Sequence, residues 1–476
     1  MSRAMLTGLS NEQGSDPTVL YYDATIINST TSDLVDGVLA APNPQIRFNE
    51  TRDVPLIKDV SKYQFSIVRF TMNGPNRDLP LFIPSIQTGQ SNVNLTTYAV
   101  SISFQQTWQD ISGNTNAFVI VPPVSFIQYV PENKNASLAP IPAAPLVKQD
   151  ITTRYYWLTS YQVFVTQVNA ALLQAHQFIY AMFVTDWSHW QTGLPGGLKS
   201  AFPFASFAEF QAYGNTPVMQ YNDPLFNIML DSQAFGAPIL PFVPIPVVPP
   251  ATNATQVTAP VMRLFFNTNM QGLFANFPNA YYNSLLINST LVPTGYTYEI
   301  LALNQAYKGV IDWRQLPYSD YVPVSQQSLY YNVTQEYRST DTLWSPVQSI
   351  VFTTALLPIR YESTAAPITV GDGNLGGSAP STQSAFQPTI TDITEDMGPT
   401  GAEVYRQFTN YIPSGEYRMN DFSPSQTSIN NIDIQVYWKC RMDGQLYPMT
   451  IYNMGSVNFK MMLRLKSHAA KSQRYD

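Results

Sequence analysis

The chain has 476 residues, enough for about two or three domains and for a large hydrophobic core without disulfide bonds. Charged residues make up only 12% of it, and 25 Lys and Arg stand against 32 Asp and Glu, for a formal net charge of −7. This balance excludes a globally basic nucleic-acid-binding protein. Thirty-seven prolines and an aromatic content of 13% favour β-structure joined by many loops.

The single cysteine, Cys440, cannot form an intramolecular disulfide, and no second cysteine exists for a Cys-based zinc site. Residues 1–17 are polar and lack the apolar stretch of a secretory signal, so we expect an N-terminal arm. No run approaches the ~18 apolar residues of a membrane helix. The sequence therefore predicts a soluble chain, made in a reducing compartment, without a membrane span.

Alternation of apolar and polar residues is the dominant pattern in the first hundred residues. It places successive side chains on opposite faces of a strand. In chain order it predicts strands at 18–28, 62–70 and 98–104. In the last of these, Ser101 and Ser103 alternate with apolar residues, so we expect a half-buried strand with both serines away from the core.

One long helix is expected from about Thr152 to Gln177. Apolar residues recur there at three- and four-residue steps from Trp157 to Ala175, and Asp150 or Thr152 can cap the first turn. We interpret this helix as packing on a core.

The middle of the chain contains a proline-rich run, 236–260, whose missing N–H groups favour an extended course over an apolar surface. Strands are predicted after it at 262–266 and 347–354. Residues 371–388 are rich in Gly, Ser, Pro and Gln, and we expect a mobile loop over 371–400.

The C-terminal part returns to alternation and predicts strands at 432–438 and 457–465. Asp433 and Gln435 occupy the polar positions of the first, and Asp443-Gly444 supplies a tight turn between the two. Residues 460–476 are basic on an acidic chain, with Lys460, Arg464, Lys466, Lys471 and Arg474. These cations would attract phosphate groups and favour contact with nucleic acid, the alternative being a solvated terminus.

The sequence contains only incomplete matches to cofactor-binding and metal-binding motifs. Residues 371–376 have the spacing of a dinucleotide-binding loop, but 377–380 cannot begin the helix that this mechanism needs. Asp392, Glu395 and Asp396 lack the loop of a Ca²⁺ site and are expected to be exposed. We therefore expect no enzyme, no metal and no cofactor.

The histidines also do not form a catalytic group. His189 lies in Asp-Trp-Ser-His-Trp, residues 186–190, which we interpret as an aromatic-flanked loop, because triad residues converge from separate elements. We expect His176 on the flank of the long helix and His468 in the C-terminal tail.

Several segments are distinctive as a set and in their order: Tyr63–Phe70, Leu79–Pro84, Gln87–Leu95, Arg263–Pro278, Trp344–Ile359 and Asn431–Trp438. Together they resemble the penton-type minor capsid proteins of polinton-like viruses, adintoviruses and virophages, which are small double-stranded DNA viruses of eukaryotes. The resemblance covers most of the chain. It implies an antiparallel β jelly roll and a homopentamer at the icosahedral fivefold vertex, with no catalytic residue.

The resemblance also implies a virion protein made in the host cytoplasm or nucleus. Its partners would be its own copies and the neighbouring major capsid protein. Packaged DNA, bound by the basic segment 460–476 facing the particle interior, and a host receptor are further candidates.

A jelly roll pairs its first strand with its last, and here the first begins near Thr18 while the last ends near Lys466. We therefore expect a discontinuous shell jelly roll from 18–110 and 340–466, an inserted domain at 110–340, and a basic tail at 467–476. The alternative is two tandem jelly rolls split near 250–320, as in double-jelly-roll major capsid proteins.

A fivefold ring needs heterologous contacts, in which one patch of a subunit meets a different patch of the next. We predict that the apolar part of the proline-rich run supplies one patch, through Ile239, Leu240, Phe242, Val243 and Ile245. The alternative is that the run covers its own sheet.

Two other functions remain open from the sequence. A carbohydrate-binding or receptor-attachment module would use Trp187, Trp190 and Trp313 as stacking platforms. A jelly-roll hydrolase would need two carboxylates about 5 to 9.5 Å apart across a groove.

Overall fold

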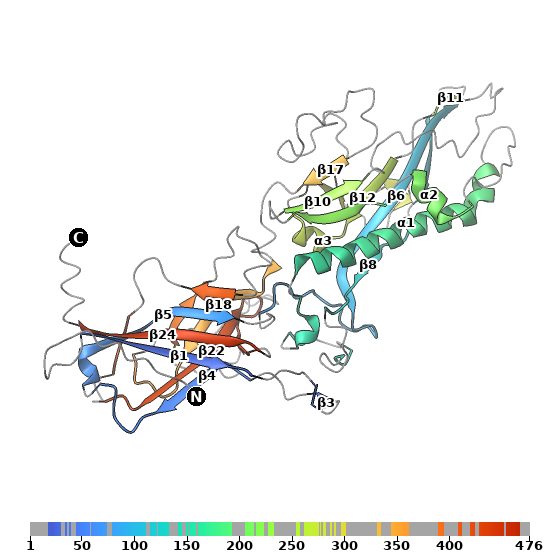
Figure 1. Cartoon of the computed structure of the whole chain (residues 1–476). Helices are drawn as coiled ribbons and strands as arrows, with labels where there is room; N and C mark the ends of the chain where they lie inside the picture. The colour runs from blue at the N-terminus through green and yellow to red at the C-terminus, as the bar shows by residue number, and fades with distance from the viewer. Residues whose placement is uncertain are drawn as a thin grey trace, which may run out of the picture. The chain divides into compact units, whose positions relative to one another are not determined.

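The computed structural model of the chain is shown in Figure 1. It describes residues 18–29, 34–35, 38–39, 44–57, 59–73, 79–110, 115–120, 122–132, 141–144, 149–151, 153–158, 160–192, 205–213, 216–222, 227–232, 254–257, 261–275, 277, 279–281, 286–287, 290–291, 297–300, 331–334, 344–360, 389–394, 408–411, 419–423, 428–451 and 454–466.

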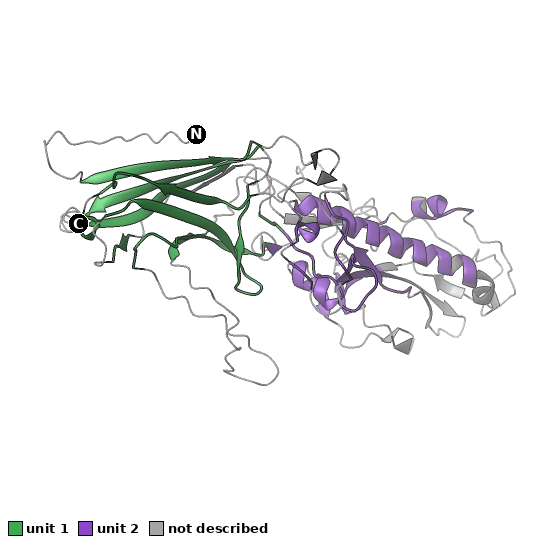
Figure 2. Ribbon diagram, turned by 90° about the horizontal axis from the view of Figure 1, so that it is seen from below, with its two compact units in different colours: residues 1–81, 135–139, 345–476 green, residues 82–134, 140–344 purple. Residues whose placement is uncertain are grey.

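The chain divides into two compact units, coloured separately in Figure 2. Unit 1 consists of residues 1–81, 135–139 and 345–476, and unit 2 of residues 82–134 and 140–344. Unit 1 therefore combines the two ends of the sequence. Its boundary differs from the expected one, because residues 82–110 belong to unit 2, where the strand β6 (Leu95–Asp110) pairs with four other strands.

Unit 1 is built on eight antiparallel strands. In chain order they are β1 (Val19–Ile27), β4 (Arg47–Thr51), β5 (Tyr63–Asn73), β18 (Val347–Thr353), β19 (Thr389–Ile393), β20 (Phe408–Tyr411), β22 (Asn431–Cys440) and β24 (Ser456–Leu465). One sheet has the order β1-β24-β5-β20, and the other has the order β4-β22-β18-β19. This is the strand order of a jelly roll. The expected fold class, mainly β with an antiparallel jelly roll and one longer helix in the inserted part, is confirmed.

The two sheets pack face to face through aromatic side chains. Phe70 of β5 meets Phe352 of β18 edge to face at 5.1 Å, and Phe459 of β24 meets Phe48 of β4 at 5.7 Å. The expected alternation places these rings inward, because the apolar residues of β24 from Val457 to Leu463 are buried. Aromatic pairs across the sandwich thus hold the two sheets in register.

Shorter elements complete unit 1. They are β2 (Leu34–Val35), β3 (Val38–Leu39), the 3₁₀ turn η1 (Val60–Lys62), β21 (Asn420–Asp421) and β23 (Leu446–Pro448). The predicted turn is confirmed at Gly444, whose φ of 70° is in the left-handed region and whose N–H donates to Cys440 O. It joins β22 to β23 rather than directly to β24.

Unit 2 contains a larger sheet with the order β11-β6-β12-β16-β13, in which β7 and β8 also pair with β6. These strands are β7 (Thr115–Ile120), β8 (Ser125–Gln128), β11 (Ala254–Val257), β12 (Val261–Phe266), β13 (Asn279–Tyr281) and β16 (Tyr298–Ile300). A three-stranded sheet holds β9 (Val218–Asn222), β10 (Asn227–Ser232) and β17 (Tyr331–Thr334). A hairpin joins β14 (Leu286–Ile287) to β15 (Thr290–Leu291).

The long helix, α1 (Tyr161–Thr192), begins and ends later than the predicted 152–177. Residues 154–156 form the 3₁₀ turn η2, and Leu158 then makes a two-way main-chain bridge to Phe82, at 2.9 and 3.1 Å. Ser160 Oγ accepts from Gln162 N at 3.2 Å and starts the helix. The apolar spacing before residue 160 therefore belongs to an extended bridge.

Helix α1 packs on β6, β8 and β9, and it is followed by α2 (Phe207–Tyr213) and α3 (Thr268–Leu273). The core between α1 and the sheet is aromatic. Phe82 lies 4.7 Å from Phe164 and 5.0 Å from Trp344, and Trp344 lies 5.1 Å from Tyr161. Trp344 also donates its indole N–H to Leu273 O at 3.0 Å, which satisfies its polar atom in this core.

Two strands that were predicted from the alternation of apolar and polar residues, at 98–104 and 432–438, are buried on both faces. Ser101 and Ser103 of β6 have no exposed surface, and neither has Asp433 of β22. The half-buried interpretation is therefore wrong at these positions. Alternation identifies a strand, but the elements that cover its second face come from distant parts of the chain.

Asp433 is a buried carboxylate with three donors from one turn. Thr354 Oγ1 donates to it at 2.5 Å, Ala355 N at 2.7 Å and Leu356 N at 2.8 Å. These bonds fix the chain where it leaves β18, and Thr354 Oγ1 in turn accepts from Leu357 N at 2.9 Å. Burial of this charge is compensated because each of its contacts is a charge-assisted hydrogen bond.

Replacing Asp433 by Asn should lower the free energy of unfolding by about 1–3 kcal/mol, because one accepting oxygen becomes a donor facing other donors. Urea denaturation measures this as a lower midpoint with an unchanged slope. The control is Asp59→Asn, at the exposed N-cap of η1, where Asn caps as well as Asp and the change should stay below about 0.5 kcal/mol. Equal effects of the two variants would contradict the assigned role.

Candidate assembly surfaces

The predicted contact residues from Ile239 to Ile245, and the run to Pro250, lie outside the described residues. The same holds for residues 371–388 with the dinucleotide-like spacing, for Glu395 and Asp396, and for His468 and Trp313. Asp392 lies on β19. Within the described residues, no three His, Cys, Asp or Glu side chains come together in a way that would hold a metal ion. No helix in the described part of the chain has the length and hydropathy of a membrane span.

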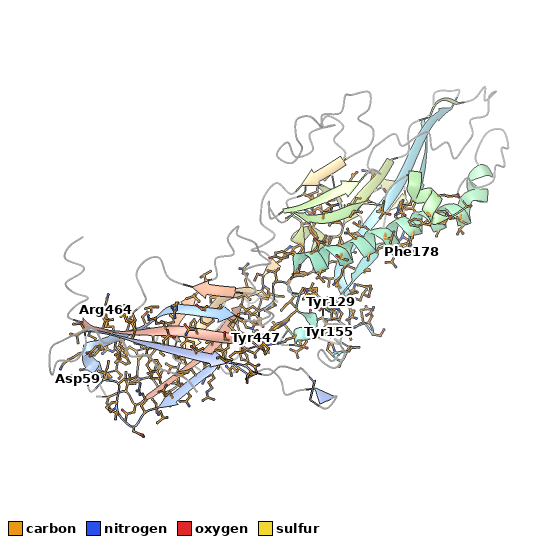
Figure 3. The ribbon with its side chains drawn as sticks, in the orientation of Figure 1. Asp59, Tyr129, Tyr155, Phe178, Tyr447 and Arg464 are labelled. Atoms are coloured by element: carbon orange, nitrogen blue, oxygen red, sulfur yellow. The ribbon has the colours of Figure 1, made fainter. Side chains whose placement is uncertain are left out.

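The basic C-terminal segment begins as a strand. Lys460 and Arg464 belong to β24, and Arg464 is labelled in Figure 3. Lys460 Nζ lies 4.8 Å from the centre of the Tyr21 ring, and Lys466 Nζ lies 3.3 Å from Asp421 Oδ1. Two of the five predicted cations therefore contact groups of their own unit, and Lys471 and Arg474 lie beyond the described residues.

A polar network covers the outward face of the sheet β1-β24-β5. Arg69 Nη2 lies 3.0 Å from Asp23 Oδ2 and donates to Asn458 Oδ1 at 2.8 Å. Asn458 donates its amide to Asp23 and, at 2.9 Å, to Thr25 Oγ1. The network crosses three adjacent strands, because Lys460 is directly opposite both Asp23 and Arg69 in the ladder. In this network the Arg69 guanidinium of β5 neutralises the Asp23 carboxylate of β1.

His176 is fully buried on α1 and forms no triad. Its Nδ1 lies 2.9 Å from Thr216 Oγ1, and its ring packs 5.3 Å from Phe207 and 5.2 Å from Phe210 of α2. Burial lowers the pKa of His176 to about 4, so the imidazole is neutral at pH 7. It is a packing residue that joins α1 to α2, which corrects the expected position on a helix flank.

His189, Trp187 and Trp190 lie within α1, so the predicted aromatic-flanked loop at 186–190 is wrong. Their side chains are outside the described ones. The sequence itself indicated that the helix continues beyond Gln177, because Ile179 extends the apolar face formed by Leu172 and Ala175, and all three are buried.

Comparison with known proteins identifies the family. The family model for the Sputnik minor capsid protein V18/19 matches residues 20–465, which is most of the chain. The chain belongs to this family of minor capsid proteins. The predicted resemblance to virophage minor capsid proteins is thereby confirmed.

The chain is also similar to individual proteins and solved structures. A curated protein of Sputnik virophage, named uncharacterized protein V18, is 32% identical over 134 residues, which are 28% of this chain and 71% of that protein. A chain in the 3.5 Å cryo-EM structure of the Sputnik virophage matches with a TM-score of 0.60 and 21% identity, over 95% of this chain and 99% of that one. The crystal structure of the mavirus penton protein matches with a TM-score of 0.48 and 13% identity, over 94% of this chain and 99% of that one.

The segments that carry the family resemblance have structural roles. In 263–278, Arg263 makes a bidentate ion pair with the buried Glu299. Its Nε donates to Glu299 Oε1 at 2.6 Å, and its Nη2 donates to Oε2 at 2.5 Å. Asn267 caps α3 by accepting from Met270 N at 2.9 Å, and its amide donates to Thr97 O at 2.8 Å. These contacts join β12, β16, α3 and β6, so the segment holds unit 2 together.

Sequence reasoning missed the network of Asp23, Arg69 and Asn458. Asp23 and Asn458 are 435 positions apart, and only the ladder between β1 and β24 brings them together. The one signal in the sequence was the presence of a polar residue in each of the three predicted strands, 18–28, 62–70 and 457–465. The sequence contains no pattern that would have paired them.

The buried His176 predicts a pH dependence of stability. Its pKa is lower in the folded chain than in the unfolded chain, so below about pH 6.5 the unfolded state binds a proton that the folded state does not. Stability from this group is therefore present above that pH and falls as the pH drops, by about 2–3 kcal/mol at pH ~4.5. In His176→Gln, the loss of unfolding free energy between pH 7 and pH 4.5, measured with urea, should be smaller by that amount. Identical losses in both proteins would refute the assignment.

Proposed function

We propose that this chain is a penton protein, a jelly-roll subunit that forms a homopentamer at the icosahedral fivefold vertices of a double-stranded DNA virus. The observation that carries the proposal is a single jelly roll made from both ends of the chain, in a member of a minor capsid protein family. A ring of five chains with one jelly roll each has the symmetry of a fivefold vertex. A trimer of chains with two jelly rolls each has six jelly rolls and suits a position with six neighbours.

The alternative of a double-jelly-roll major capsid protein has less support. Among the described strands of unit 2, the order β11-β6-β12-β16-β13 is not that of a jelly roll. Unit 2 is instead an insertion between β5 and β18, which are the third and fourth strands of the jelly roll in chain order. We propose that this insertion carries contacts to neighbouring capsid proteins or to a host receptor.

Further partners follow from the same proposal. The chain would contact its own copies, the neighbouring major capsid protein and, through the segment 460–476, packaged DNA. Because Lys460 and Lys466 already contact Tyr21 and Asp421, the DNA contact would rest on Arg464 and on the two cations beyond residue 466.

Electron microscopy of the purified full chain tests the penton proposal. We expect rings with fivefold symmetry, and quantitative mass spectrometry of virions should give about 60 copies per particle, five at each of twelve vertices. Trimers present in hundreds of copies would instead indicate a major capsid protein.

The predicted contact run provides a second test. Replacing both Phe242 and Val243 by Ser should shift the chain from pentamer to monomer in sedimentation velocity, because an apolar patch loses its burial between subunits. The β-type circular dichroism should not change. The matched control replaces Thr252 and Asn253, outside the apolar run, by Ser. A double variant that still sediments as a pentamer would assign this run to its own subunit.

A further inference from the structure

Strand β1 is an edge strand with one side open. It pairs with β24 along all of Val19–Ile27 and with no other strand in the described part of the chain, and Figure 1 shows it as the long blue strand beside the red β24. Thr18 O accepts from Leu465 N, and Asn28 N donates to Gly455 O, both at 2.9 Å. In an antiparallel ladder only every second residue directs its main-chain N–H and C=O groups to the partner strand. These two bonds show that the even-numbered residues of β1 are the ones that bond to β24.

The odd-numbered residues therefore direct their main-chain N–H and C=O groups to the open side. They are Val19, Tyr21, Asp23, Thr25 and Ile27. Their side chains point to the outward face of the sheet, where Tyr21 is 37% and Ile27 68% exposed. Within the described residues, no main-chain hydrogen bond satisfies this side of the strand.

The strand itself lacks the sequence features that protect edge strands. Natural edges are usually short, bulged, or interrupted by Pro or Lys. Strand β1 has nine residues in unbroken register and contains neither Pro, Gly nor Lys. The other outer strands of the jelly roll, β4, β19 and β20, have five, five and four residues.

The single charge on the edge strand is already compensated. Asp23 is bound to Arg69 at 3.0 Å and to Asn458, so it does not repel an approaching main chain. Donors and acceptors that repeat every two residues, about 6.8 Å, are complementary to another extended main chain.

We propose that the open edge of β1 is a subunit-joining surface, at which an extended segment of a neighbouring copy of this chain adds as a further strand. The inference rests on the proposed homopentamer, which supplies identical copies around one axis. Because ring contacts are heterologous, the added segment is a part of the neighbour other than its own β1.

Hydrogen exchange of the full chain, compared between monomer and ring at single-residue resolution, tests this directly. The amides of Tyr22 and Ala24 bond to β24 and should be protected in both states. The amides of Tyr21, Asp23 and Thr25 should exchange fast in the monomer and about tenfold or more slowly in the ring.

A variant pair keeps the test independent of folding. Thr25→Pro removes one N–H on the open side without removing a bond to β24, and Pro is tolerated at such positions of edge strands. Thr25→Val is the control, because it loses the same contact with Asn458 and keeps the N–H. Thr25→Pro should raise the monomer fraction in sedimentation at least about fivefold relative to Thr25→Val, with equal urea midpoints.

The outcomes separate the two proposals. If wild-type rings form while the three open-side amides still exchange fast, this inference is overturned and the penton proposal stands. If no rings form at any concentration, the penton proposal fails, and this inference fails with it. If Thr25→Cys chains join as disulfide-linked dimers, β1 pairs with β1 across a twofold axis, and the heterologous assignment is overturned.

Discussion

The pairing of the first strand with the last is the constraint on which the rest of the structure depends. Strand β24 lies between β1 and β5, so the sheet β1-β24-β5-β20 is incomplete until the last strand has arrived. Contacts between Asp23 and Asn458 close a loop of 435 residues, whose entropic cost is about 5 kcal/mol for a flexible chain. A folded unit 2 shortens the flexible part of this loop, because residues 82–134 and 140–344 then act as one compact connection between β5 and β18. The insertion is thus compatible with closing the jelly roll from both ends of the chain.

The local sequence predicted five of the eight strands of the sandwich, β1, β5, β18, β22 and β24, because each faces a core on one side. It missed β4, β19 and β20, and β19 lies in the segment that was expected to be a mobile loop. The regular alternation from Val457 to Leu463 corresponds directly to buried rings and aliphatic chains. It failed where a second layer covers the other face. Asp433 reads as a solvent-facing residue until the turn at 354–356 donates three hydrogen bonds to it. Burial of this kind depends on residues nearly eighty positions away, and no local period records it.

The helix shows a second limit of local patterns. Apolar residues at three- and four-residue steps occur both in α1 and in the bridge before it, and Trp157 fits either. The two-way main-chain bond of Leu158 to Phe82 decides between them, and it is a long-range contact. The basic segment 460–476 shows a related ambiguity, because its excess of Lys and Arg overlaps the alternation that predicts a strand at 457–465. The structure places Lys460 and Arg464 on β24, as that alternation predicts, since outward positions of a surface strand accept charged side chains.

Charge is scarce in this chain, and where the structure describes it, much of it is used within a unit. Arg69 binds Asp23, Arg263 binds Glu299 and Lys466 binds Asp421. Copies of one chain carry the same net charge, −7 here, and repel each other when they are brought close. A low charge content reduces this repulsion, and ion pairs closed within a subunit leave few charges to be desolvated between subunits. In the proposed homopentamer, contacts between copies would then depend on main-chain hydrogen bonds and apolar burial. Both are supplied by a sheet edge such as β1, with its open ladder and its exposed Tyr21 and Ile27.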